Sequence, residues 1–149
     1  MLRENLNKNT QELEQELRES SSFEAFSSSM DNRFLAAEVG RDLAALIKKH
    51  KVKKTELFLD ANIHENYGYQ ILNGTRYPSR EVLLSIFLSL HLPYEEANRF
   101  LREHGFSPLY VRRKFDAAII YSLMHGWSVL KCNELLHENG LPLLKRETT

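Results

Sequence analysis

Amide side chains recur at helical spacing in the middle of the chain, and amides are groups that can read nucleic-acid bases. Asn66, Gln70 and Asn73 are four and three residues apart, so they share one face if this segment is a helix. Asn and Gln can each form two hydrogen bonds with an adenine edge, and the neighbouring Glu65 and Tyr69 could contact cytosine N4, a phosphate or a thymine methyl group. We interpret this face as a candidate base-reading surface; the alternative is a merely solvated helix face.

A run of lysines lies shortly before this segment. Five of the seven residues from Lys48 to Lys54 are lysines, which can neutralise phosphates. The chain has zero net charge, but its first forty residues hold eight acidic and only four basic residues. Half of the sixteen basic residues after Gly40 fall between Arg41 and Arg80, with four acidic residues. An acidic N-terminal arm therefore offsets a locally basic region, although the lysines could also be a solvated helix end.

The apolar pattern predicts the elements that would carry these side chains. Ile63, Tyr67 and Ile71 are four residues apart and form the inner face of one helix, while Asn62 suits the reversal before it, because Asn tolerates a left-handed conformation. We find no alternating strand pattern. Helices are predicted at 10–19, up to about His50, at 54–61 and 64–73, from Pro78-Ser79, from Pro93 to Gly105, from Ser107-Pro108 through 115–124, and at 129–139.

The pattern formed by Leu57, Asn62-Ile63, the run from Tyr67 to Ser79, Leu83 to Ile86, and Leu90 resembles the Xre family of helix-turn-helix proteins, which includes lambda repressor and Cro. The resemblance covers about Arg41–Leu101 and implies five helices, of which the third enters the DNA major groove. By this resemblance Glu65, Asn66 and Gln70 match base-reading positions, Lys54 the phosphate-contacting start of the second helix, and Asn73 a contact to the DNA backbone. The full set of predicted DNA-contacting residues is Lys53, Lys54, Thr55, His64, Glu65, Asn66, Tyr69, Gln70, Asn73 and Arg76.

Four positions depart from the family pattern. Asn62 stands in place of the usual turn glycine, and Glu65 places a negative charge on the groove-facing side. Phe58 stands where a small residue is usual and is expected to separate the two paired helices. Gly68 stands where an apolar residue is usual and costs about 1 kcal/mol inside a helix.

The predicted fold is all-α: a five-helix, lambda-repressor-like domain over 34–104, a C-terminal helical extension over 105–149, and an acidic, Ser-rich N-terminal arm over 1–33. The serine-rich stretch from Ser20 to Ser29 is interpreted as a flexible linker, with a phospho-acceptor tract or docking peptide as the alternative. The apolar C-terminal helices either pack against the first five helices or form a dimer interface, which two DNA half-sites would require.

Other chemistry has little support in the sequence. The single cysteine, Cys132, is expected to be a buried structural thiol, and the six histidines are scattered. Glu134 and His137 resemble half of a di-iron motif, without the second copy that such a site needs. We therefore expect no catalytic site, metal or cofactor. The most apolar stretch, 82–94, is too short to span a membrane and the N-terminus does not resemble a secretory signal, so a cytoplasmic protein is expected.

These observations favour a sequence-specific, double-stranded-DNA-binding transcription regulator, not an enzyme, that acts as a homodimer and resembles an antitoxin-type repressor. The N-terminal arm would then contact a protein partner. The alternative is a protein-interaction adaptor that keeps the helix-turn-helix fold without reading DNA and is linked to a signalling kinase.

Overall fold

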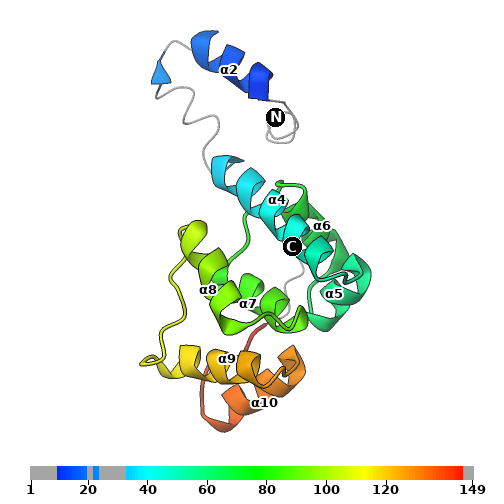
Figure 1. Cartoon of the computed structure of the whole chain (residues 1–149), viewed down its shortest axis with the longest axis vertical. Coiled ribbons are helices and arrows are strands. Elements are labelled where there is room, and N and C mark those ends of the chain that lie inside the picture. Colours follow the sequence, from blue (N-terminus) through cyan, green and yellow to red (C-terminus); the bar gives the residue numbers. More distant parts are fainter. Residues whose placement is uncertain (1–9, 20–21, 24–32, 146–149) are drawn as a thin grey trace.

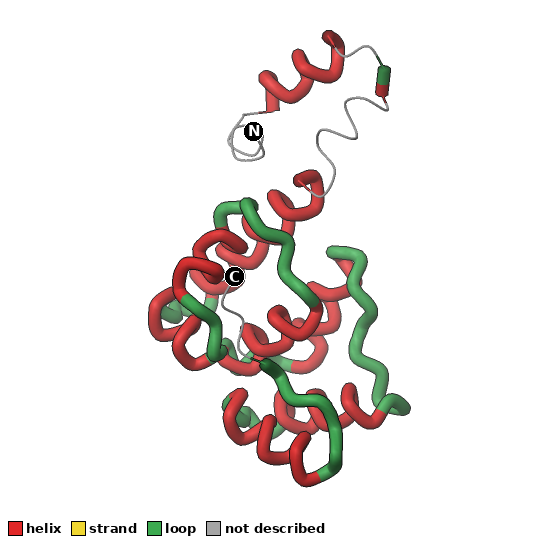
Figure 2. Tube along the Cα trace, turned by 180° about the vertical axis from the view of Figure 1, so that it is seen from behind, coloured by secondary structure: helices red, strands yellow, loops and turns green. Residues whose placement is uncertain are grey.

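The computed structural model describes residues 10–19, 22–23 and 33–145 of the chain. Within these ranges the protein is all-helical, as predicted, with eight helices and no strand (Figures 1 and 2). The helices are α2 (Thr10–Glu19), α4 (Arg33–Lys49), α5 (Lys54–Asp60), α6 (Glu65–Leu72), α7 (Arg80–Ser89), α8 (Tyr94–Glu103), α9 (Lys114–Met124) and α10 (Val129–Glu138).

Helix α7 is the centre of the fold. Every residue from Val82 to Ser89 is buried, which is the pattern of a helix surrounded by protein. It contacts α5 on one side and both α9 and α10 on another, so elements far apart in sequence meet around it (Figure 1). The hydroxyl of Ser79 caps its start by accepting a hydrogen bond from the Val82 amide at 3.2 Å, which confirms the predicted beginning of this helix.

The C-terminal helices pack against this centre. Apolar residues of α9 and α10 belong to the same core cluster as those of α4 to α8. After α10 the chain folds back, and Leu144 is buried. Its amide donates a hydrogen bond to Asn133 Oδ1 at 2.8 Å, and its carbonyl oxygen accepts one from Asn133 Nδ2 at 3.0 Å. The chain after α10 therefore returns to the core at Leu144.

The segment between α8 and α9 differs from the prediction. Ser107-Pro108 was expected to begin a helix, but the helix begins only at Lys114. Side chains satisfy the backbone groups of this segment instead: Asn98 bonds both the amide and the carbonyl of Leu109, at 2.7 and 3.3 Å, and Arg80 donates to the carbonyl oxygens of residues 107 and 108. These partners remove the need for helical hydrogen bonds there.

The N-terminal helix α2 was predicted correctly over Thr10–Glu19, and it contains no buried residue. The predicted serine-rich linker lies largely outside the described residues, as does the tail after Lys145. No helix in the described ranges is both long and apolar enough to cross a membrane.

Candidate nucleic-acid interface

Helices α5 and α6 are joined by a tight turn that reverses the chain. Asn62 adopts φ +60°, the left-handed conformation that the sequence predicted for it. Next to it the Ile63 amide bonds the carbonyl oxygen of Phe58 at 2.8 Å, which closes the end of α5. Ala61 and Ile63 are buried, so the turn is anchored to the core on both sides of Asn62.

The inner face of α6 is buried as predicted. Tyr67 is 6% exposed and Ile71 is 1% exposed. Because these residues are four apart, their burial fixes the rotation of α6 about its axis. The opposite face is thereby directed away from the core.

Two of the departures from the Xre pattern that the sequence resembles, Phe58 and Gly68, compensate each other. Phe58 is 1% exposed and lies against Gly68, where a Cβ atom would come within 2.6 Å of the Phe58 ring. The bulk added on α5 therefore occupies the space left by the missing side chain on α6. A glycine that looks unfavourable in an isolated helix is required by the residue across the helix pair.

A second close approach holds α6 against α4. A Cβ atom on Gly40 would lie 2.5 Å from the carbonyl oxygen of Ile71 and 2.8 Å from that of Leu72. Gly74, with φ +82°, lies against Ala37 at the same crossing. The close approach at Gly40 was not predicted from the sequence, because a glycine inside a helix pattern does not reveal which backbone it meets.

The outer face of α6 carries the predicted base-reading side chains. Glu65, Asn66 and Tyr69 are exposed and Gln70 is half-buried. Within residues 33–145 the side chains of Glu65, Asn66 and Gln70 form no hydrogen bond or ion pair. Their polar atoms are therefore not already committed to partners in this part of the chain.

The residues at the two ends of α6 hold the helix itself. At its start, His64 Nδ1 accepts a hydrogen bond from the Asn66 amide at 3.3 Å, so His64 is the N-cap. At its end, Asn73 Oδ1 accepts from the Thr75 amide at 3.0 Å and also from the Thr75 hydroxyl. Both were predicted DNA contacts, and both side chains also have this structural role.

Two further predicted residues lie against aromatic rings. The Tyr69 ring packs edge-on against Phe58, with ring centres 5.2 Å apart, and stays 37% exposed. The Arg76 guanidinium lies 5.2 Å from the centre of the Tyr67 ring, within cation–π range. These contacts restrict where Tyr69 and Arg76 point from the surface.

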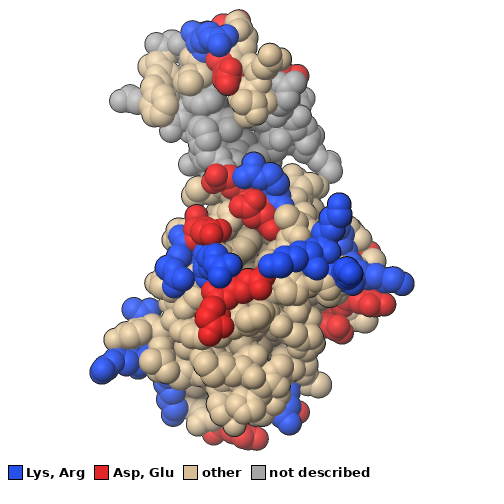
Figure 3. Space-filling view, viewed as in Figure 1, with Lys and Arg blue, Asp and Glu red and all other residues tan. Residues whose placement is uncertain are grey.

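The lysines gather where α4 ends and α5 begins (Figure 3). Lys48, Lys51, Lys53 and Lys54 are exposed, as is Thr55. None of these four lysines forms an ion pair within residues 33–145. Lys53 and Lys54 thus present positive charge at the start of α5, close in sequence to the turn that leads into α6.

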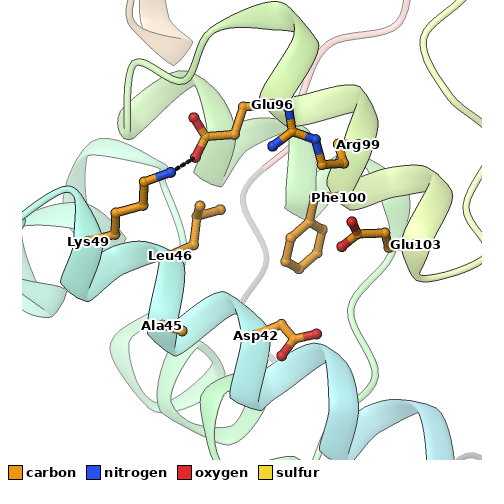
Figure 4. Close-up of a pocket in the computed structure, with 8 residues that line it drawn as sticks. All are labelled: Asp42, Ala45, Leu46, Lys49, Glu96, Arg99, Phe100 and Glu103. Carbon is orange, nitrogen blue, oxygen red and sulfur yellow. Dashed lines mark hydrogen bonds and ion pairs between the residues drawn. The ribbon is translucent and has the colours of Figure 1, made fainter.

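Lys49 has a different role, because it faces α8. Its Nζ lies 3.2 Å from Oε1 of Glu96 (Figure 4). His50 Nε2 lies 3.1 Å from the same oxygen. Partial burial raises the pKa of Glu96, but hydrogen bonds from His50 and Lys49 and their nearby charge outweigh this effect and lower the pKa below its ordinary value. Glu96 therefore ties α8 to the end of α4.

Arg80 is also removed from the basic surface. Its guanidinium donates hydrogen bonds to both carboxylate oxygens of Asp116, at 3.0 and 3.1 Å, and the Asp116 side chain is 3% exposed.

Compared with known proteins, the chain matches no family model, no curated protein and no solved structure. The function of the protein is therefore inferred from the geometry of the chain itself.

Proposed function

We propose that this protein is a sequence-specific, double-stranded-DNA-binding transcription regulator of the Xre type. In this proposal α4 to α8 are the five helices of a lambda-repressor-like domain, and α6 is the recognition helix in the major groove. Glu65, Asn66, Tyr69 and Gln70 contact base edges.

One observation carries the proposal: a rigidly seated helix presents an uncommitted amide face next to a surface of unpaired lysines. The burial of Tyr67 and Ile71 and the contact between Phe58 and Gly68 hold α6 in one orientation. Specific base contacts need such orientation, because a bidentate amide bond tolerates little displacement. Lys53 and Lys54 supply the phosphate contacts that position the helix on the duplex.

The proposed active form is a homodimer. Regulators with this motif read two half-sites about one helical turn apart, and a two-fold pair of recognition helices matches that spacing. Sedimentation of the protein with a duplex of two half-sites should give a complex of two chains per duplex, and one chain per duplex would contradict the dimer.

The test of the function is binding to duplexes selected from a random-sequence pool. Fluorescence anisotropy on a selected site and on its scrambled version, at two salt concentrations, should show at least about a thousandfold preference for the selected site. Asn66→Ala/Gln70→Ala should weaken binding to the selected site by about 1–3 kcal/mol for each lost base contact while leaving scrambled DNA almost unaffected.

The matched control is Gln11→Ala/Gln15→Ala, which removes two amides from α2 instead of α6 and should not change the preference for the selected site. Lys53→Ala/Lys54→Ala should weaken binding to both duplexes equally and reduce the salt dependence. Equal affinity for selected and scrambled duplexes would rule out sequence-specific recognition.

A second candidate function is the protein-interaction adaptor. It is favoured by two exposed leucines, Leu59 on α5 and Leu130 on α10, which are 78% and 73% exposed. They line one recess of about 410 Å³ together with Ser89, His91 and other residues. Exposed leucines around a recess are typical of a protein contact surface. Substitution of both leucines with Ser should abolish partner binding and spare DNA binding if the two functions are separate.

A further inference from the structure

The surface beside α4 and α5 contains an apolar groove bordered by lysines. Ile47, 1% exposed, and the half-buried Val52 form its floor, and Lys48 and Lys54 stand at its rim. The groove has a volume of about 400 Å³ and is also lined by Ala44 and Ala45. We call it the Lys48–Lys54 groove.

Helix α2 has the complementary character. Its ten residues include four glutamates and one arginine, and Leu13 and Leu17 form a stripe one turn apart. No residue of α2 is buried. A ten-residue helix is only marginally stable alone in water, so a surface that covers its leucine stripe would stabilise it.

We propose that α2 of this chain docks in the Lys48–Lys54 groove, with Leu13 and Leu17 on the apolar floor and the glutamates facing the lysines at its rim. An acidic helix with an apolar stripe fits an apolar groove with a basic rim, and charge complementarity selects the partner. The docked helix covers Lys48 and Lys54.

Charge also decides between this groove and two others on the described surface. The lining of the groove between α4 and α8 has three acidic residues, Asp42, Glu96 and Glu103, and two basic residues, Lys49 and Arg99, so it lacks the net positive charge that an acidic helix needs (Figure 4). The apolar groove between α9 and α10 has a single lysine, Lys114, in its lining. The Lys48–Lys54 groove has two lysines in its lining, and Lys51 and Lys53 lie nearby in sequence.

The chain is long enough for this contact. Residues 20–32 separate α2 from α4 and can span at most about 45 Å when fully extended. The distance along α4 from Arg33 to Ala44 is about 17 Å at the helical rise of 1.5 Å per residue. Helix α2 can therefore return along α4 to the groove.

Docking of α2 would also weaken the proposed DNA contact. Only this effect on DNA binding rests on the proposed function. Lys54 belongs both to the groove rim and to the predicted phosphate-contacting residues. A bound α2 competes with the DNA backbone for it. Release of α2 would then strengthen duplex binding.

The docking is tested on the full chain by paramagnetic relaxation. A nitroxide is attached at Gln11→Cys, on the face of α2 opposite the leucines; the native Cys132 is fully buried and does not react. We expect the amides of residues 44–54 to broaden selectively. The same label in a Leu13→Gln/Leu17→Gln background should leave them sharp, and Gln15→Ala should retain the broadening.

Each other outcome overturns the docking. Absent or uniform broadening, or broadening that survives the leucine substitutions, excludes this contact. A mixture of spin-labelled chains and isotope-labelled chains without nitroxide tests for a second copy, and equal broadening in the mixture excludes docking within one chain.

Duplex affinity is measured separately. Leu13→Gln/Leu17→Gln should bind a selected duplex at least about fivefold more tightly than the native chain does, which is the low end of typical couplings between sites. Equal affinities would overturn the competition. Selective broadening with no duplex binding by either protein would support the docking and overturn the proposed function.

Discussion

At the scale of single residues, the contact between Phe58 and Gly68 shows how two unusual residues form one well-packed feature. Considered alone, each departs from the Xre pattern that the sequence resembles. Together they keep the volume between α5 and α6 filled, because the ring occupies the place of a Cβ atom on the facing helix.

We predict that the effect of Gly68→Ala on stability changes sign with the residue at position 58. In the native chain the new methyl group meets the buried ring and should cost about 1–2 kcal/mol, because overpacking exceeds the gain in helix propensity. In a Phe58→Ala background the same change should stabilise the protein by about 1 kcal/mol. Urea unfolding midpoints of the four proteins test this, and the same sign in both backgrounds would contradict it.

The sequence was sufficient to predict which helix faces are buried, but not which residues those faces contact. Periodicity alone predicted that Tyr67 and Ile71 are buried and that Tyr69 is at the surface. It could not reveal that Gly68 serves Phe58 or that Gly40 meets the end of α6. Such contacts join residues whose proximity depends on the tertiary fold, and no local pattern encodes them.

At the scale of elements, the same limit explains the late start of α9. Ser107-Pro108 has the composition of a helix start, but Asn98 and Arg80 bond the backbone that follows it. Tertiary hydrogen bonds outweighed a local preference worth about 1 kcal/mol. The exposure of the outer face of α6 was predicted more completely, because this face follows directly from the buried inner face.

The link between α4 and α8 gives a pH-dependent prediction. Because the folded pKa of Glu96 lies below its ordinary value of 4.5, Glu96 stabilises the fold above that pH, and the contribution is lost as pH falls through the folded pKa. Glu96→Gln should cost about 1 kcal/mol at pH 7. The difference from the native protein should not decrease between pH 7 and about pH 5, and it should shrink below pH 4.5.

Urea unfolding at a series of pH values measures this difference. Glu95→Gln is the matched control, because Glu95 is the exposed neighbour on the same turn of α8 and should show no such dependence. A difference that is unchanged down to pH 3 would exclude the contribution of the ionised Glu96.

At the scale of the whole molecule, the described helices from α4 to α10 share one core. The cluster of buried apolar residues runs from Val39 to Leu144, and α7 touches helices on both sides of it. The half-buried Arg80 guanidinium on α7 and the buried Asp116 carboxylate on α9 add an ion pair, and Asp116 also accepts a hydrogen bond from the Tyr110 amide at 3.0 Å. The C-terminal helices are therefore attached by packing and by a satisfied polar network.

From this arrangement we predict that α4 to α10 unfold as one cooperative unit. The single tryptophan, Trp127, lies just before α10 and reports on the C-terminal pair, whereas far-ultraviolet circular dichroism reports on all helices. The two signals should change at the same urea concentration. Arg80→Ala leaves the buried Asp116 carboxylate without its charged partner and should lower both midpoints together, with a loss of about 3–5 kcal/mol. If the tryptophan signal changed first, residues 105–149 would be an independently stable extension instead of part of a common core.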